Sequence, residues 1–204
     1  MPHTLVALEI LAAESGPALT TFMPKRYIAP VVNGPVRLRL LEFADLPMTL
    51  AWRNQDHIRE WFFHSALITP AQHRTWWERY QVRDDDFVFV IEETETLKRT
   101  VGQLALYNID WVARRAEFGR LMIGDAEARG LGLAGLATSR LVNEAFHVWG
   151  LCEVYLEVLP DNVAALAVYR ACGFREVRRN SVAVLMRRGR SSHAVAEIDT
   201  NSRQ

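Results

Sequence analysis

Hydrophobic and polar residues alternate along residues 36–42, VRLRLLE, with the period of a strand that buries one face. After this strand, Asp45 and Pro47 occupy the cap and first turn of a helix that we expect to extend to about residue 62. A second helix is predicted over residues 70–82. The patterned part of the chain therefore begins with one strand and a helical pair.

The rest of the chain predicts three strands, a long helix and a closing set of strands around one more helix. The three strands are expected at residues 87–93, 100–110 and 115–124, and the long helix repeats apolar residues at Leu133, Ala137, Leu141 and Ala145. A strand at 152–159, a helix at 163–172 that Gly173 ends, and a strand pair at 174–179 and 181–188 complete the pattern. The predicted fold class is α/β (α+β), with a central mixed, mostly antiparallel sheet of about six or seven strands flanked by about four helices.

Composition divides the chain into one domain and two less regular ends. Half of the 204 residues are hydrophobic, which is enough for the core of one domain, and we place it at residues 35–188. Residues 1–34 lead into the breaker cluster NGP and are expected to form an N-terminal extension, with Met23 as an alternative start. Residues 189–204 are polar and are predicted to be a disordered tail.

Charge and cysteine content exclude several classes of partner. Twenty-four basic residues balance twenty-four acidic ones, so no global field favours nucleic acid or an anionic membrane. No apolar run approaches the roughly 20 residues of a membrane helix, and the N-terminus lacks the basic region of a signal peptide. The two cysteines, Cys152 and Cys172, lack metal-ligand spacing and suit a reducing compartment. We therefore expect a cytoplasmic protein without a metal, and we leave open whether it is a monomer or a homodimer.

The stretch EARGLGLAG at residues 127–135 fits two different ligand-binding patterns. Gly130, Gly132 and Gly135 match the dinucleotide pattern G-x-G-x-x-G, whereas the same stretch read from Arg129 matches R-x-x-G-x-A. A dinucleotide fold puts its first glycine at the end of its opening strand and needs further strand–helix units after it. Polar residues separate Gly130 from the preceding strand, and too little chain follows, so the second pattern is favoured.

The second pattern requires only a strand, a glycine loop and a helix. Glycines let backbone N–H groups approach an anion closely, and the helix N-terminus adds about half a positive charge directed at it. A pyrophosphate would be held there. The alternative is a glycine-containing turn that binds nothing.

The segments on both sides of the loop favour a ligand. RAEFGRLMIG, ARGLGLAGLATSRLVNEAF and CEVYLEVLPDNVAALAVYRACGF follow one another, so R-x-x-G-x-A is followed by a strand and by N-x-x-A-x-x-x-Y-x-x-x-G-F at residues 162–174. This succession resembles the GNAT superfamily of acyl-coenzyme A dependent N-acetyltransferases over about residues 36–188. The resemblance implies acetyl transfer from acetyl-CoA, as cosubstrate, to a primary amine of a small molecule or a protein N-terminus, without a metal.

The resemblance also implies where coenzyme A binds. The residues whose backbone amides would hold the pyrophosphate are Arg129, Gly130, Leu131, Gly132, Leu133 and Ala134. The strand edge at Met122 and Ile123 would pair with the pantetheine arm, and the strands before and after the loop would splay apart to admit the thioester. Asn162 would contact pantetheine, although helix capping is what this residue alone favours.

Two residues are the predicted catalytic groups. An amine with a pKa of about 10.4 is mostly protonated at pH 7 and then has no lone pair, so the enzyme must remove a proton or bind the neutral form. By resemblance, Tyr169 would protonate the departing thiolate and Glu117 would accept the proton of the amine, directly or through water. A core tyrosine and a glutamate in a cross-strand ion pair are the alternatives. His64 and His73 are further candidates for the base.

The first helical pair is expected to bind the acceptor. Its W-R-N, followed by I-T-x-x-x-H-x-x-W, resembles the amino-sugar-nucleotide N-acetyltransferases of pseudaminic-type acid synthesis. The substrate-binding residues predicted on this basis are Trp52, Arg53, Asn54, His73 and Trp76. Aromatic faces suit sugar rings and nucleobases, and an arginine suits a phosphate. Core packing is the alternative for the two tryptophans.

Other acceptors and one other class of protein stay open. The competing acceptor is the N-terminal amine of a ribosomal or other protein, because that acetyltransferase branch shares the I-G, A-T and G-F landmarks of this chain. An antibiotic amine is a third acceptor. A non-catalytic sensor or interaction module that binds coenzyme A is the alternative of a different class.

Overall fold

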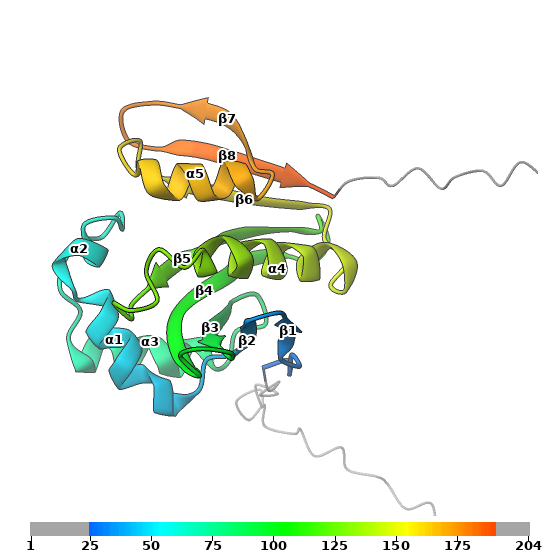
Figure 1. The fold of residues 1–204 in the computed structure, drawn as a ribbon. Helices are drawn as coiled ribbons and strands as arrows, with labels where there is room; N and C mark the ends of the chain where they lie inside the picture. The colour runs from blue at the N-terminus through cyan, green and yellow to red at the C-terminus, as the bar shows by residue number, and fades with distance from the viewer. Residues whose placement is uncertain (1–24, 191–204) are drawn as a thin grey trace, which may run out of the picture.

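The computed structural model describes residues 25–190, which build one sheet with helices on both of its faces (Figure 1). The strands are β1 Val31–Asn33, β2 Val36–Leu40, β3 Phe87–Glu93, β4 Arg99–Asp110, β5 Arg115–Ile123, β6 Glu153–Val158, β7 Arg175–Arg179 and β8 Val184–Gly189. The α-helices are α1 Leu46–Arg53, α2 Asp56–Arg59, α3 Pro70–Tyr80, α4 Leu133–His147 and α5 Val163–Ala171, and a 3-10 helix η1 spans Phe43–Asp45.

The sheet order is β1-β2-β3-β4-β5-β6-β8-β7, and every neighbouring pair is antiparallel except β5 with β6. The predicted mixed, mostly antiparallel sheet is confirmed. The described residues form eight strands and five α-helices, slightly more of each than predicted. The additional strand, β1, pairs with β2 and lies in the segment that we predicted as an N-terminal extension. Residues 1–24, with Met23, and residues 191–204 of the predicted tail lie outside the described part of the chain.

The prediction of one helix up to residue 62 is wrong, because the chain breaks after α1 and starts again as α2. The side-chain amide of Asn54 binds the backbone of Ile68 twice: Nδ2 donates to the carbonyl oxygen at 2.8 Å, and Oδ1 accepts from the amide at 2.9 Å. Gln55 is then extended, with ψ at 132°, and begins the short α2. An asparagine that binds distant backbone competes in this way with helix continuation.

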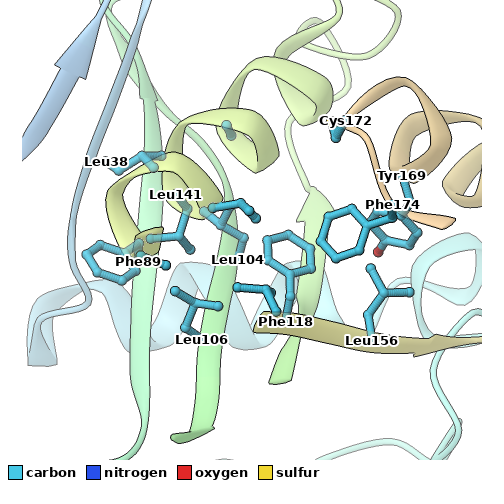
Figure 2. Packing of buried hydrophobic residues seen from close by; sticks show 14 of the residues in the cluster. Leu38, Phe89, Leu104, Leu106, Phe118, Leu141, Leu156, Tyr169, Cys172 and Phe174 are labelled. Atoms are coloured by element: carbon cyan, nitrogen blue, oxygen red, sulfur yellow. The ribbon is translucent and has the colours of Figure 1, made fainter. Parts of the chain in front are cut away.

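Alternating residues of the central strands build two hydrophobic layers. Leu38 and Leu104 face Leu141 of α4 in the larger core, which Figure 2 shows from close by. On the opposite face, Val90 packs in a smaller core with Tyr80 of α3. The helical pair that was predicted to bind the acceptor and the helix that follows the glycine loop thus cover opposite faces of the same sheet.

The sheet opens between β5 and β6, as predicted. These parallel strands are paired only from Arg115 with Glu153 to Glu117 with Tyr155, and β5 then continues to Ile123 paired with β4 alone. None of the helices in residues 25–190 is long and apolar enough to cross a membrane.

Candidate active site

The glycine loop has the backbone geometry that an anion site requires. Gly130 and Gly132 have φ angles of 77° and 74°, which residues with a Cβ adopt rarely, and Gly132 caps the 15-residue helix α4. A Cβ built on either glycine would meet no atom within 4 Å, so the surface above the loop is bare. The amides of residues 130–134 donate no hydrogen bond to the described part of the chain. Free N–H groups at a helix N-terminus fit the pyrophosphate of coenzyme A.

Contacts of Arg129 and Asp125 fix the start of this loop to its surroundings. The Arg129 guanidinium donates to Oε1 of Gln55 at 3.2 Å and to the carbonyl oxygen of Gly124 at 3.3 Å, which ties the loop to the segment between α1 and α2. Before the loop, Asp125 forms an ion pair of 2.6 Å with Arg99 of β4. The chain that leads into the proposed pyrophosphate site is therefore anchored to the segment between α1 and α2 and to β4.

A cavity of about 410 Å³ lies at the opening between β5 and β6, and below we call it the amine cavity. The predicted site residues that line it are Glu117, Met122, Ile123, Arg129, Ala134, Asn162 and Tyr169. Side chains from the α2 segment, among them Phe62 and Phe63, line it as well. The structure thus brings together both predicted catalytic residues and five of the residues predicted to bind coenzyme A.

Two neighbouring side chains hold the carboxylate of Glu117. The Tyr107 hydroxyl donates to Oε1 at 2.7 Å, and Nδ2 of Asn108 donates to Oε2 at 2.9 Å. Burial and the bond to Glu117 raise the pKa of Tyr107, so its hydroxyl stays a donor at neutral pH. Glu117 forms no ion pair with any described residue, which removes the cross-strand ion pair as its explanation.

Tyr169 belongs both to the core and to the wall of the amine cavity. Only 7% of it is exposed, and its ring packs edge-on against Phe118 and Phe174 at centroid distances of 5.8 and 5.9 Å (Figure 2). Burial raises the pKa of the phenol. A protonated hydroxyl with a fixed ring is a suitable donor to charge that develops in the cavity.

Asn162 is a helix cap that also lines the amine cavity. Its Oδ1 accepts from the amide of Ala165 at 3.1 Å and so caps α5. The contact with pantetheine stays a prediction.

A second cavity of about 600 Å³ adjoins the amine cavity, and Phe62 and Phe63 line both. We call it the arginine cavity, because Arg53 and Arg120 line it together with His64, His73 and Trp76. Three of the five predicted substrate-binding residues therefore lie in one cavity. The two histidines that were alternative base candidates lie there too, rather than in the amine cavity with Glu117.

Trp52 and Asn54 line neither of these two cavities. Trp52 packs on Gly124 so closely that a Cβ there would lie 2.0 Å from Cγ of the indole. Asn54 uses its amide on the backbone of Ile68. For both residues the structure shows a packing or bracing contact, and a contact with the acceptor stays a prediction.

Sequence reasoning missed Tyr107, Asn108, Arg120 and Glu157. Asn108 and Arg120 have positive φ angles of 49° and 54° beside irregular register between β4 and β5. A regular strand pattern hides such irregularities, so it gave no signal that Tyr107 would reach Glu117. In residues 25–190 no group of three histidine, cysteine or carboxylate side chains could hold a metal ion.

Comparisons with known proteins agree with this geometry. The family model described as an acetyltransferase (GNAT) domain matches residues 36–175. The spermidine N(1)-acetyltransferase of Vibrio cholerae is 27% identical over 145 residues, 71% of this chain and 82% of that protein. The spermidine N(1)-acetyltransferase of Escherichia coli is 29% identical over 139 residues, 68% of this chain and 72% of that protein.

Solved structures show the same fold. The crystal structure of spermidine N-acetyltransferase from Vibrio cholerae, in complex with CoA and spermine, superposes with a TM-score of 0.67 at 24% identity, covering 76% of this chain and 94% of that one. A domain from Methanocaldococcus jannaschii gives 0.66 at 19% identity, covering 77% and 99%. The relatives named for an activity are spermidine N-acetyltransferases, not specifically the predicted amino-sugar or ribosomal-protein types. The chain belongs to the GNAT acetyltransferase family and is an acetyl-CoA-dependent N-acetyltransferase.

Proposed function

We propose that this enzyme acetylates a primary amine of a small molecule, and that Glu117 binds the amine and accepts its proton directly or through one water. The observation that carries the proposal is the placement of Glu117 in the same cavity as Tyr169, with one donor on each carboxylate oxygen. Those donors fix the carboxylate but use only two of its roughly four lone-pair positions. The remaining positions are free to meet an ammonium group.

The other side of the amine cavity suits the acetyl donor. Acetyl-CoA supplies the acetyl group as a thioester. The amides of residues 130–134 would bind its pyrophosphate, and the free edge of β5 at Met122 and Ile123 would pair with the pantetheine arm. Tyr169 would donate its hydroxyl to the sulfur as negative charge develops there, because its raised pKa keeps it protonated.

A linear polyamine is the first candidate acceptor. The relatives of this chain are named spermidine N(1)-acetyltransferases. The amine cavity offers a second carboxylate, Glu157, whose only ion pair among the described residues is a loose one of 3.8 Å with Arg178. A molecule with two cationic nitrogens could therefore meet two carboxylates in one cavity.

An amino sugar or its nucleotide is the second candidate, and a different observation favours it. The arginine cavity, beside the amine cavity, combines aromatic walls with the cation of Arg53 and is lined by no carboxylate. Such a surface suits a sugar or base that carries a phosphate rather than a second ammonium group.

The test is acetyl-CoA turnover by the full chain with single amines, read as release of free thiol. The panel contains spermidine, a uridine diphosphate amino sugar, an aminoglycoside and a peptide with a free N-terminus. We expect a small-molecule amine to be acetylated, and we expect Glu117→Gln to lower the rate by about 10² or more, the range of general-base catalysis. Glu95→Gln, at an exposed glutamate outside both cavities, is the matched control. Preference for the peptide, or full activity of Glu117→Gln, would contradict the proposal.

A further inference from the structure

The arginine cavity contains a cation that the described part of the chain does not neutralise. We propose that this cavity binds an anionic group, phosphate or carboxylate, attached to a planar ring, with the oxygens meeting Arg53 and the ring lying against Phe63 and Leu67. The structure favours an anionic group that belongs to the far end of the acceptor molecule. This part of the proposal rests on the proposed function. A separate effector molecule with the same chemistry is the alternative source.

Arg53 is a guanidinium without an acidic partner among the described residues. Its Nη1 is buried and has no hydrogen-bond partner, and Nη2 donates to the backbone carbonyl of His64. The cation lies 4.1 Å from the centre of the Phe62 ring. Burial and the nearby Arg59 lower its pKa, yet a guanidinium remains charged in proteins. What favours an anion is that the Arg53 side chain lines a cavity with no carboxylate and forms no ion pair with any described residue.

The second arginine of the cavity differs in this respect. Arg120 donates to both carboxylate oxygens of Asp86, at 2.7 and 3.0 Å, and Asp86 is buried. The Arg120 guanidinium also lies 4.4 Å from the centre of the Tyr107 ring. Its charge is therefore matched and its position fixed. Arg53 is therefore the arginine of the cavity that has no ionic partner among the described residues. The other titratable side chains that line the cavity are His64 and His73.

The apolar wall of the cavity is large and exposed. Phe63 is 51% exposed and Leu67 is 63% exposed, although both line a concave surface. The side-chain amide of Gln103 lies in the same wall and makes no hydrogen bond with the described residues. A volume of about 600 Å³ is within the range of small-molecule sites and accommodates a ring of nucleobase size. Apolar faces, one amide and one guanidinium without an acidic partner among the described residues are complementary to a planar, polar-edged group with an anion.

The position of the cavity connects this group with the acceptor. Phe62 and Phe63 line both cavities, so the two cavities lie side by side, and the proposal requires the acceptor to extend past these rings from Glu117 to Arg53. A polyamine would instead place an ammonium group beside an unmatched guanidinium, which like-charge repulsion disfavours. An acceptor long enough to reach the arginine cavity is therefore expected to carry an anion at that end, whereas a polyamine held by Glu117 and Glu157 would stay within the amine cavity.

The test is calorimetric titration of the full chain, without acetyl-CoA, with uridine monophosphate, uridine, inorganic phosphate and spermidine at pH 7.5. We expect uridine monophosphate to bind, and we expect Arg53→Gln to weaken it about tenfold or more, the loss of one charge-assisted contact. Uridine should bind more weakly than uridine monophosphate and equally to both proteins. Arg53→Lys should restore part of the affinity. Arg74→Gln, at an exposed arginine of α3 outside both cavities, should bind like the unaltered protein.

Inhibition kinetics then identify the source of the anion. Competition between uridine monophosphate and the accepted amine places the anionic group on the acceptor, whereas inhibition or activation that the amine does not relieve assigns it to a separate effector. Absence of binding at millimolar concentration, or equal binding to the unaltered protein and to a folded Arg53→Gln, would overturn the anion site. Because binding is measured without turnover, Glu117→Gln should retain it, so failure of the proposed function and failure of this site are distinguishable.

Discussion

The Tyr107 hydroxyl of β4 lies 2.7 Å from Oε1 of Glu117 on β5, and Gly119 leaves room for this contact. A Cβ built on Gly119 would lie 2.8 Å from Oη of Tyr107, closer than real Cβ contacts allow. The strand that carries the proposed base thus also carries the glycine over which its tyrosine partner lies. The orientation of the Glu117 carboxylate therefore depends on the lack of a side chain at Gly119, two residues further along β5.

Gly119→Ala should lower the turnover number because the new methyl group displaces the Tyr107 hydroxyl from Glu117. Its loss of rate should be no larger than that of Tyr107→Phe, because the methyl group disturbs the contact that Tyr107→Phe removes. Tyr107→Phe, which removes a hydrogen bond to a charged group, should cost about tenfold or more. Since both changes act on one contact, the double variant should lose little beyond Tyr107→Phe alone. Fully additive losses, measured as the amine kcat/KM of all four proteins, would show that Gly119 acts elsewhere.

Gly132→Asp should abolish coenzyme A binding, because it places a negative charge where the pyrophosphate is expected. The residue has φ of 74°, a conformation that asparagine and aspartate tolerate better than most side chains do. Gly132→Asn is therefore the matched control, with almost the same shape and no charge. We expect the aspartate variant to lose about 10²-fold more affinity than the asparagine variant in a calorimetric titration with coenzyme A. Equal affinities of the two folded variants would place the diphosphate elsewhere.

Tyr169→Phe should lower the maximal rate more than it raises the Michaelis constant for acetyl-CoA. The ring would keep its packing against Phe118 and Phe174, and only the donor to the developing thiolate would be lost. The expected loss of rate is about 10²-fold. Tyr27→Phe, at a tyrosine that is 80% exposed, should be unchanged. A rate equal to that of the unaltered protein would leave Tyr169 with a packing role alone.

The sequence predicts the fold well where local pattern and tertiary packing agree. The alternation in residues 36–42, the glycine before α4 and the cap at Asn162 each have a local physical cause, and the structure places β2, α4 and α5 accordingly. The helical pair is predicted less well. The break at Asn54 depends on its amide meeting the backbone of Ile68, 14 residues away, and no local propensity records such a contact.

The candidate site shows the same division. The glycine loop and the Tyr169 helix are contiguous motifs, and sequence reasoning finds them. The contacts of Glu117 with Tyr107 and Asn108 require two strands in a register that irregular residues shift, and a period-two pattern cannot reveal this register. The pairing of Arg120 with Asp86, which leaves Arg53 as the unmatched cation, likewise depends on contacts 34 residues apart.

Anion binding in the arginine cavity should strengthen as the pH falls below neutral. Burial lowers the pKa of His73 below its usual 6.5, so the ring is neutral at pH 7.5, and an anion beside it would favour the protonated form. In the protein without an anion, the lowered pKa of His73 makes the free energy of unfolding decrease as the pH falls below 6.5. The reason is that the unfolded chain takes up the proton at a higher pH than the folded chain does. The probe is a cyclic nucleoside monophosphate, whose charge is constant between pH 5 and 8.

The affinity of the cyclic nucleoside monophosphate, measured by calorimetry between pH 7.5 and 5.5, should rise as the pH falls. The rise should be at most about tenfold per pH unit, the limit for one coupled proton. His73→Gln should flatten this dependence while it leaves the affinity at pH 7.5 nearly unchanged, because the neutral imidazole contributes no charge there. A pH dependence that persists in His73→Gln would contradict the assignment of the proton to His73. Affinity that falls on acidification in the unaltered protein would contradict an anion beside this histidine.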